Sequence, residues 1–267
     1  HFLSISGGSD RFSYYSGFNF AQDLAGTKGT QAKSTLVTNR LSYQLANFLT
    51  LRSNISMDYN WGNQGINNLA GEIRALQPYQ MLLDEHGNPI NNYFGYNKVE
   101  NDRLLGLGYL DHGVNLLTDN NLANNKSTGF GIRSIFGMDW KLMKGLRLTN
   151  DLVYERLNGR QRNLYNQDSY FTRSLVNRFT AYDDAAKGYV KHIPYGDILD
   201  LNYTNAKRMA SRNQLNYENT FAERHYLNVI AGADISKRIT DNGSQRMLGF
   251  NDELYSSQDI DAKKLAL

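Results

Sequence analysis

The 267-residue sequence contains no cysteine and only three prolines. The absence of cysteine excludes disulfide bonds and thiolate metal sites, and it suits a protein that passes through an oxidising compartment without disulfides. The prolines Pro78, Pro89 and Pro194 lie in stretches that we predict to be loops, because proline cannot donate a hydrogen bond within a central strand. The five histidines are scattered and form no metal-binding pair, so the sequence predicts no metal or other cofactor.

Long apolar runs and concentrated charge are also missing. No stretch approaches the roughly 18 apolar residues that a transmembrane helix requires, and the mean hydropathy is −0.57. The 29 basic and 26 acidic residues give a net charge of +3 and are mixed along the chain. Because there is no basic tract, we expect no nucleic acid as a partner.

Aromatic residues are what the sequence has in excess. They make up 12% of the chain, with 18 Tyr and 12 Phe, although the hydrophobic share of 40% is slightly low for a globular domain. Aromatic enrichment without general hydrophobicity is typical of the interfacial girdles of membrane barrels and of surfaces that stack on sugars.

Apolar and polar residues alternate along eight segments, which pair into four consecutive hairpins. Tight turns near 7–10, 46–48, 143–145 and 222–225 join each pair, whereas long outer loops near 62–127 and 160–207 separate the hairpins. One side of the strands is apolar, and the other carries full charges such as Arg52, Arg133 and Arg212. The expected strands of roughly 10 to 14 residues exceed the usual globular length and match a tilted membrane strand.

These features predict an all-β fold, an antiparallel up-and-down transmembrane β-barrel segment of about eight strands that covers residues 1–267 and contacts outer-membrane lipid. The alternative is a soluble β-sandwich or surface-binding module, since sandwich strands also alternate. The two folds differ in what covers the apolar residues of the strands. A barrel exposes this outward set to lipid, whereas a sandwich packs it on another sheet; the set is Leu51, Ile55, Phe136, Met138, Trp140, Leu148, Val229 and Ile235.

The direction of the hairpins gives a further expectation. If the tight turns face the periplasm, the first strand descends and the eighth ascends, so both ends of the eight-strand unit lie on the side of the long loops. Complete bacterial barrels usually begin and end in the periplasm. We therefore expect an internal segment of a larger barrel, with neither a plug nor a signal peptide.

Several phrases in the sequence resemble, in the same order, the SusC/RagA family of TonB-linked outer-membrane transporters. They are LSISGGS at 3–9 with FSYY at 12–15, LLDEHGNP at 82–89, MDWK at 138–141 with KGL at 144–146, NLY at 163–165 with DSYFTR at 168–173, GDILD at 196–200, QLNY at 214–217 and AGAD at 231–234.

The resemblance implies a barrel of 22 strands that is filled by an N-terminal plug. It implies three kinds of partner: a surface lipoprotein of the SusD type, TonB, which would contact the absent plug region, and an imported oligosaccharide or peptide. This segment would then be about the first third of the barrel after the plug, and transport would need the rest of the protein.

Candidate binding residues follow from the loops and the charged side. Tyrosines among amide and charged residues can stack on a ligand, or they can fold the long loops onto the rim; they are Tyr93, Tyr96, Tyr109, Tyr165 and Tyr170. The arginines Arg52, Arg133 and Arg212 can line a transport path, or they can pair with Asp58, Asp139 and Asp234.

Two other patterns have plainer explanations. Asp84, Glu85 and His86 carry metal-binding and acid–base groups. However, the residues that follow, Gly87-Asn88-Pro89, are types that favour tight turns, so we expect a turn here. No nucleophile–base arrangement occurs, so we predict no enzyme. Apolar spacing within 68–83 predicts one or two turns of helix that pack within the loop or contact a partner or substrate.

Overall fold

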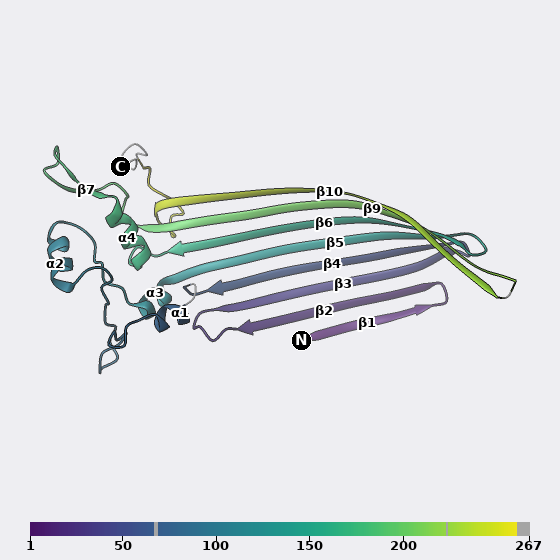
Figure 1. The fold of residues 1–267 in the computed structure, drawn as a ribbon, viewed down its shortest axis with the longest axis horizontal. Coiled ribbons are helices and arrows are strands. Elements are labelled where there is room, and N and C mark those ends of the chain that lie inside the picture. The colour runs from purple at the N-terminus through teal and green to yellow at the C-terminus, as the bar shows by residue number, and fades with distance from the viewer. Residues whose placement is uncertain (67–68, 223, 261–267) are drawn as a thin grey trace.

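One antiparallel sheet of eight strands dominates the computed structural model, which describes residues 1–66, 69–222 and 224–260. The strands lie in the order β1-β2-β3-β4-β5-β6-β9-β10, so each strand pairs with its neighbour in this series. Their bounds are β1 Phe2–Ser9, β2 Phe12–Leu24, β3 Gln31–Ala46, β4 Leu49–Gln64, β5 Ala123–Met143, β6 Leu146–Tyr165, β9 Asp197–Phe221 and β10 His225–Phe250. Figure 1 shows a long curved sheet with β1 and β10 at its two edges.

The remaining elements belong to the two long loops. They are α1 Leu69–Arg74, α2 Lys98–Gly106 and α3 Leu116–Leu122 in the first loop, and α4 Tyr170–Arg178, β7 Thr180–Asp183 and β8 Gly188–Lys191 in the second. Both loops gather at the end of the sheet opposite the tight turns, at the left of Figure 1. We call residues 65–66, 69–122 and 166–196 together the loop cap.

Hydrogen bonds join the two loops of the cap. The Asn177 side chain accepts from the Leu110 N–H at 2.7 Å and donates to the Leu110 carbonyl at 2.8 Å. The Arg173 guanidinium donates to the carbonyls of Asp111 and Gly113. Because Asn177 is buried, these bonds replace contacts with water and hold the loops as one unit.

The predicted eight strands and four hairpins are confirmed, but the predicted strand lengths are wrong. The strands run up to 26 residues, and the long loops shrink to residues 65–122 and 166–196. In the extra residues, such as 204–214 and 236–246, polar residues also occupy positions of the apolar side, Asn205 and Lys207 on β9 and Lys237 and Asp241 on β10, so the period-two signal is interrupted there although pairing continues. The third outer connection, residues 25–30, is short. Residue 223 of the last tight turn lies outside the described residues.

Cross-strand register defines the two faces of the sheet, because residues directly opposite each other lie on one face. Leu51 lies opposite Tyr43 and Met138, and we call this side the apolar face; Arg52 lies opposite Ser42 and Gly137, on what we call the charged face. The predicted outward set falls entirely on the apolar face. Within the described residues the other sheet is the small β7–β8 pair of the loop cap, so the sandwich alternative is wrong.

The described residues form no protein layer over most of the apolar face. Phe136 is 52% exposed and Ile235 is 73% exposed, whereas only ten hydrophobic side chains are buried among the described residues. Several of these ten lie in the loop cap, and Leu164, Leu199 and Phe250 form a small cluster at its border. Soluble monomers rarely expose so large an apolar patch, so this face must meet another apolar phase or protein.

The two loop patterns noted in the sequence, at 84–89 and within 68–83, form a turn and a short helix. Asp84 accepts hydrogen bonds from the backbone N–H groups of His86 and Asn88 at 2.9 and 2.7 Å, which closes the predicted turn. The helix predicted within 68–83 is confirmed only as α1, and residue 68 lies outside the described residues. Among the described residues, no helix has the length and apolarity to cross a membrane.

Candidate functional site

The charged face carries a row of ionic groups across five adjacent strands, β4, β5, β6, β9 and β10. Arg52 on β4 lies in register with Gly137, Asp151, Arg212 and Asp234. The Arg52 guanidinium donates to Asp139 at 2.6 Å and to Asp151 at 2.9 Å. Arg212 pairs with Asp234 at 2.9 Å.

Gly137 makes room for the contact between Arg52 and Asp151. A Cβ at Gly137 would lie 2.7 Å from Oδ1 of Asp151 and 2.8 Å from Cζ of Arg52, closer than real Cβ atoms come. Arg52 therefore crosses β5 over Gly137 and reaches a carboxylate two strands away.

A second row contains more arginine than acid. Glu155 pairs with Arg133 at 3.2 Å and with Arg208 at 3.3 Å, and Arg208 lies directly opposite Arg238. The sequence thus placed Arg52, Arg133 and Arg212 correctly on one face, and the structure decides their partners. Arg212 pairs with Asp234 as expected, Arg52 holds Asp139, and Asp58 accepts from Asn60.

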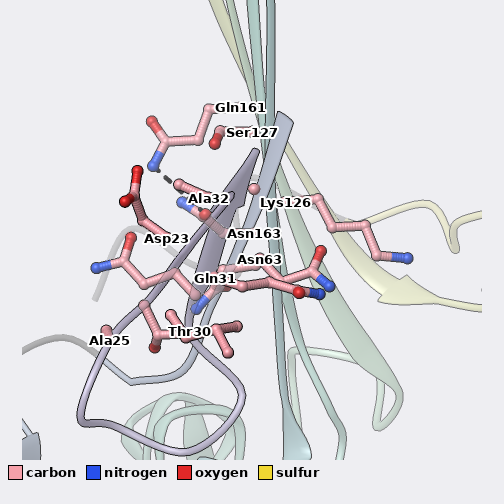
Figure 2. A pocket seen from close by; sticks show the side chains of 14 residues that line it. Asp23, Ala25, Thr30, Gln31, Ala32, Asn63, Lys126, Ser127, Gln161 and Asn163 are labelled. Carbon is pink, nitrogen blue, oxygen red and sulfur yellow. Dashed lines mark hydrogen bonds between the residues drawn. The ribbon is translucent and has the colours of Figure 1, made fainter. Parts of the chain in front are cut away.

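Two cavities open at the loop end of the strands, and the second also borders the loop cap. Four amide residues of the charged face line both: Gln64, Asn125, Gln161 and Asn163. Their volumes are about 300 and 230 Å³. Figure 2 shows the first, in which Gln161 and Asp23 lie on one side of the sheet while Lys126 is directed away. The four residues alternate with outward residues on β4, β5 and β6, so register alone brings them together. We call this amide-lined region the mouth.

The second cavity adds aromatic and acidic groups to the mouth. Tyr165 and Phe171 lie with ring centroids 4.2 Å apart, and both line the cavity. Asp119 of α3 accepts from the Tyr170 N–H at 3.1 Å, and burial raises the pKa of its carboxyl. Oδ1 of Asn125 is buried with no hydrogen-bond partner in this structure. The mouth therefore offers the unpaired amide oxygen of Asn125 beside an aromatic pair.

The predicted tyrosines separate into two groups. Tyr165 lines the mouth, whereas Tyr93, Tyr96, Tyr109 and Tyr170 are not among the residues that line either cavity.

Two of the others pack within the loop cap. The Tyr96 and His112 rings lie 4.4 Å apart, Tyr109 lies 5.3 Å from Tyr189, and the Tyr109 hydroxyl donates to the Thr180 carbonyl at 3.3 Å. These rings hold the cap together.

The amide residues of the mouth were not predicted from the sequence. Asn163 and Gln161 lie in a polar run at the end of β6, and Asn125 lies in another at the start of β5. Clustered Asn and Gln next to the predicted loops were the available signal, but such runs are also common in solvated turns. Among the described residues, no group of three or more acidic or histidine side chains is placed to hold a metal ion.

Aromatic side chains border the apolar face on two sides. On the turn side, Phe48 and Trp140 lie with ring centroids 6.3 Å apart. On the loop side, Trp61 lies 5.3 Å from Tyr59 and 6.2 Å from Phe20.

Comparison with known proteins supports this architecture. No protein-family model and no curated protein matches the chain. Among solved structures, the RagAB peptide importer in its closed-closed state matches with a TM-score of 0.69 at 15% identity, over 100% of this chain and 27% of that chain.

The RagAB peptide transporter and the open-open state of the importer match with TM-scores of 0.64 and 0.65, also at 15% identity. Each match covers 95% of this chain and 26% or 25% of that chain. The chain therefore has the fold of about a quarter of a RagAB chain, in agreement with its resemblance to SusC/RagA transporters.

Proposed function

We propose that this chain is part of the barrel wall of a TonB-dependent outer-membrane transporter of the SusC/RagA type, which imports peptides. The observation that carries the proposal is a single sheet with an uncovered apolar face on one side and ionic rows on the other. Lipid would cover the apolar face, and the charged face would line a wet lumen that also holds a plug.

The distance between the two aromatic borders fits a bilayer. Trp140 lies opposite Leu49, and Trp61 lies about 12 residues further along β4. At about 3.3 Å per residue the separation is about 40 Å along the strand. A tilt of about 40° reduces it to about 30 Å, the thickness of a hydrocarbon core.

A peptide is the substrate that the mouth fits best. Each Asn and Gln side chain both donates and accepts, which matches the N–H and C=O groups of a peptide backbone. The similar solved structures are described as peptide importers. An oligosaccharide, which could stack on Tyr165 and Phe171, is the competing substrate.

The proposed partners follow from the two ends of the sheet. A SusD-like surface lipoprotein would sit on the loop cap, where Tyr79 and Tyr182 are exposed. TonB would act through the plug from the side of the tight turns.

The membrane assignment is tested by cysteine scanning in the full-length transporter, since this chain adds no cysteine of its own. Fluorophores at F136C and I235C, on the apolar face, should be quenched by a lipid-borne quencher. Fluorophores at S56C and T204C, on the charged face, should be quenched only by a water-soluble one. Lipid quenching of both pairs, or of neither, would overturn the assignment.

The substrate assignment is tested by measuring peptide and oligosaccharide binding to the same transporter. Asn125→Leu and Asn163→Leu should each weaken peptide binding about fivefold, because one hydrogen bond contributes about 1 kcal/mol. Asn124→Leu is the matched control, since Asn124 lies on the other face of β5. Loss of oligosaccharide binding with peptide binding intact would overturn the peptide assignment and leave the transporter assignment standing.

A further inference from the structure

Basic side chains cluster on the loop-side part of the apolar face. Besides Arg162, which pairs with Asp252, the basic residues in register with this face are Lys33, Lys126, Arg156, Arg160, Lys207 and Lys237. Among the described strand residues, the acidic residues in register with the same face are Asp241 and, at the loop end of β9, Asp197. None of the six basic groups forms an ion pair within the described residues; Arg160 donates to the Tyr255 hydroxyl at 3.3 Å. We call these six residues the basic belt.

Three of the cations lie close together. Arg156 on β6 and Lys207 on β9 are directly opposite each other, and Lys237 on β10 lies one step diagonally from Lys207. Directly opposed side chains have Cβ atoms about 5 Å apart, and like charges in that position are destabilising. On the charged face the sheet relieves such contacts with carboxylates, as Glu155 does between Arg133 and Arg208. Asp241 lies at the other diagonal of Lys207 but forms no ion pair with these three cations in this structure, so an external anion would relieve their repulsion.

The position of the belt indicates which anion is available. Arg156 lies in the same row as Met57 and Ile132, and Lys237 in the same row as Ile55, so the cations adjoin the apolar band. The loop-side aromatic border of Tyr59 and Trp61 lies close by along β4. Interfacial aromatic residues followed by Lys and Arg are typical of the level at which lipid headgroups lie.

We propose that the basic belt binds the phosphate groups of anionic lipid headgroups in the leaflet on the loop-cap side. This inference rests on the proposed function, because it requires lipid against the apolar face. Arg156 and Lys207 would share one phosphate between β6 and β9, and Lys237 would bind it from β10. The guanidinium can form two parallel hydrogen bonds to phosphate oxygens, and each lysine contributes a point charge.

The experiment is native mass spectrometry of the full-length transporter released from bilayers that contain equal amounts of phosphatidylglycerol and phosphatidylcholine. The wild type should retain phosphatidylglycerol in preference. In the variant R156Q/K207Q/K237Q the ratio of bound phosphatidylglycerol to bound phosphatidylcholine should fall by roughly fivefold for each cation that contacted the lipid. The control K141Q/K144Q/R147Q removes the same charge near a tight turn and should keep the wild-type preference.

The outcomes separate the two proposals. Equal preference in the wild type and R156Q/K207Q/K237Q would overturn the belt, as would displacement of phosphatidylglycerol by inorganic phosphate alone at matched ionic strength. If F136C and I235C are quenched by lipid but the preference is absent, only the belt fails. If neither position is quenched by lipid, the membrane assignment fails first.

Discussion

The crossing of Arg52 over Gly137 makes the sharpest prediction. In Gly137→Ala the new Cβ would lie 2.8 Å from the Arg52 guanidinium carbon, so the side chain must lift and its 2.9 Å contact with Asp151 must break. Because both side chains are partly exposed, losing that pair costs about 0.5–1 kcal/mol. Crowding by the new Cβ destabilises the fold by about a further 1 kcal/mol. Replacing a strand glycine with alanine stabilises it by about 0.5–1 kcal/mol.

The expected net result is a loss of about 1 kcal/mol in the free energy of unfolding, from the same terms. In an Arg52→Ser background the guanidinium is absent and Asp151 can rotate away, so Gly137→Ala should become neutral or stabilising by about 0.5 kcal/mol. The assay is urea unfolding of the full-length transporter in micelles, followed by its heat-modifiable gel mobility. Equal destabilisation in both backgrounds would refute the crossing as the reason for the glycine.

Two further predictions concern the loop cap. Burial and a 2.7 Å hydrogen bond to Asp168 raise the pKa of Tyr195 to about 12. Since this pKa is raised in the folded state, the contribution of protonated Tyr195 to folding stability is complete below pH 10 and is lost as the pH rises from 10 to about 12. Tyr195→Phe should remove this step from a profile of thermal stability against pH. A profile unchanged by the substitution would contradict the assignment. Asn177→Ala should cost about 2–3 kcal/mol locally, because it leaves the N–H and C=O of Leu110 unpaired. Limited proteolysis of residues 98–122 should then accelerate, whereas Asn166→Ala should leave the rate unchanged; equal rates in Asn177→Ala and wild type would contradict the role of Asn177.

The sequence predicts the strands only where one of their faces is apolar. Val229 and Ile235 alternate with polar residues, and this part of β10 was predicted. Asp241 and Asn242 continue the strand with polar residues on both faces, so local pattern could not distinguish strand from loop. The partner strand β9 decides the matter, because its hydrogen bonds satisfy the backbone of β10 to the loop cap.

The candidate site shows the same division. Tyr165 was chosen for its residue type among polar neighbours, and it does line the mouth. Tyr96 and Tyr109 were chosen for the same reason, but they pack on His112 within the loop cap. Residue type cannot tell these cases apart, since either use needs an aromatic ring beside hydrogen-bonding groups.

What the sequence alone determined is local: tight turns, hairpin pairing, and which residues share a face, because side chains alternate with a period of two. What only the tertiary structure decided is the meeting of residues from distant strands. Arg52 reaches Asp151, 99 positions along the chain, and Asn125 lies opposite Asn163, because the register of successive strands adds up across the sheet. A slip of one residue in any pair would move every following side chain to the other face, so the ionic rows, the mouth and the basic belt all depend on that register.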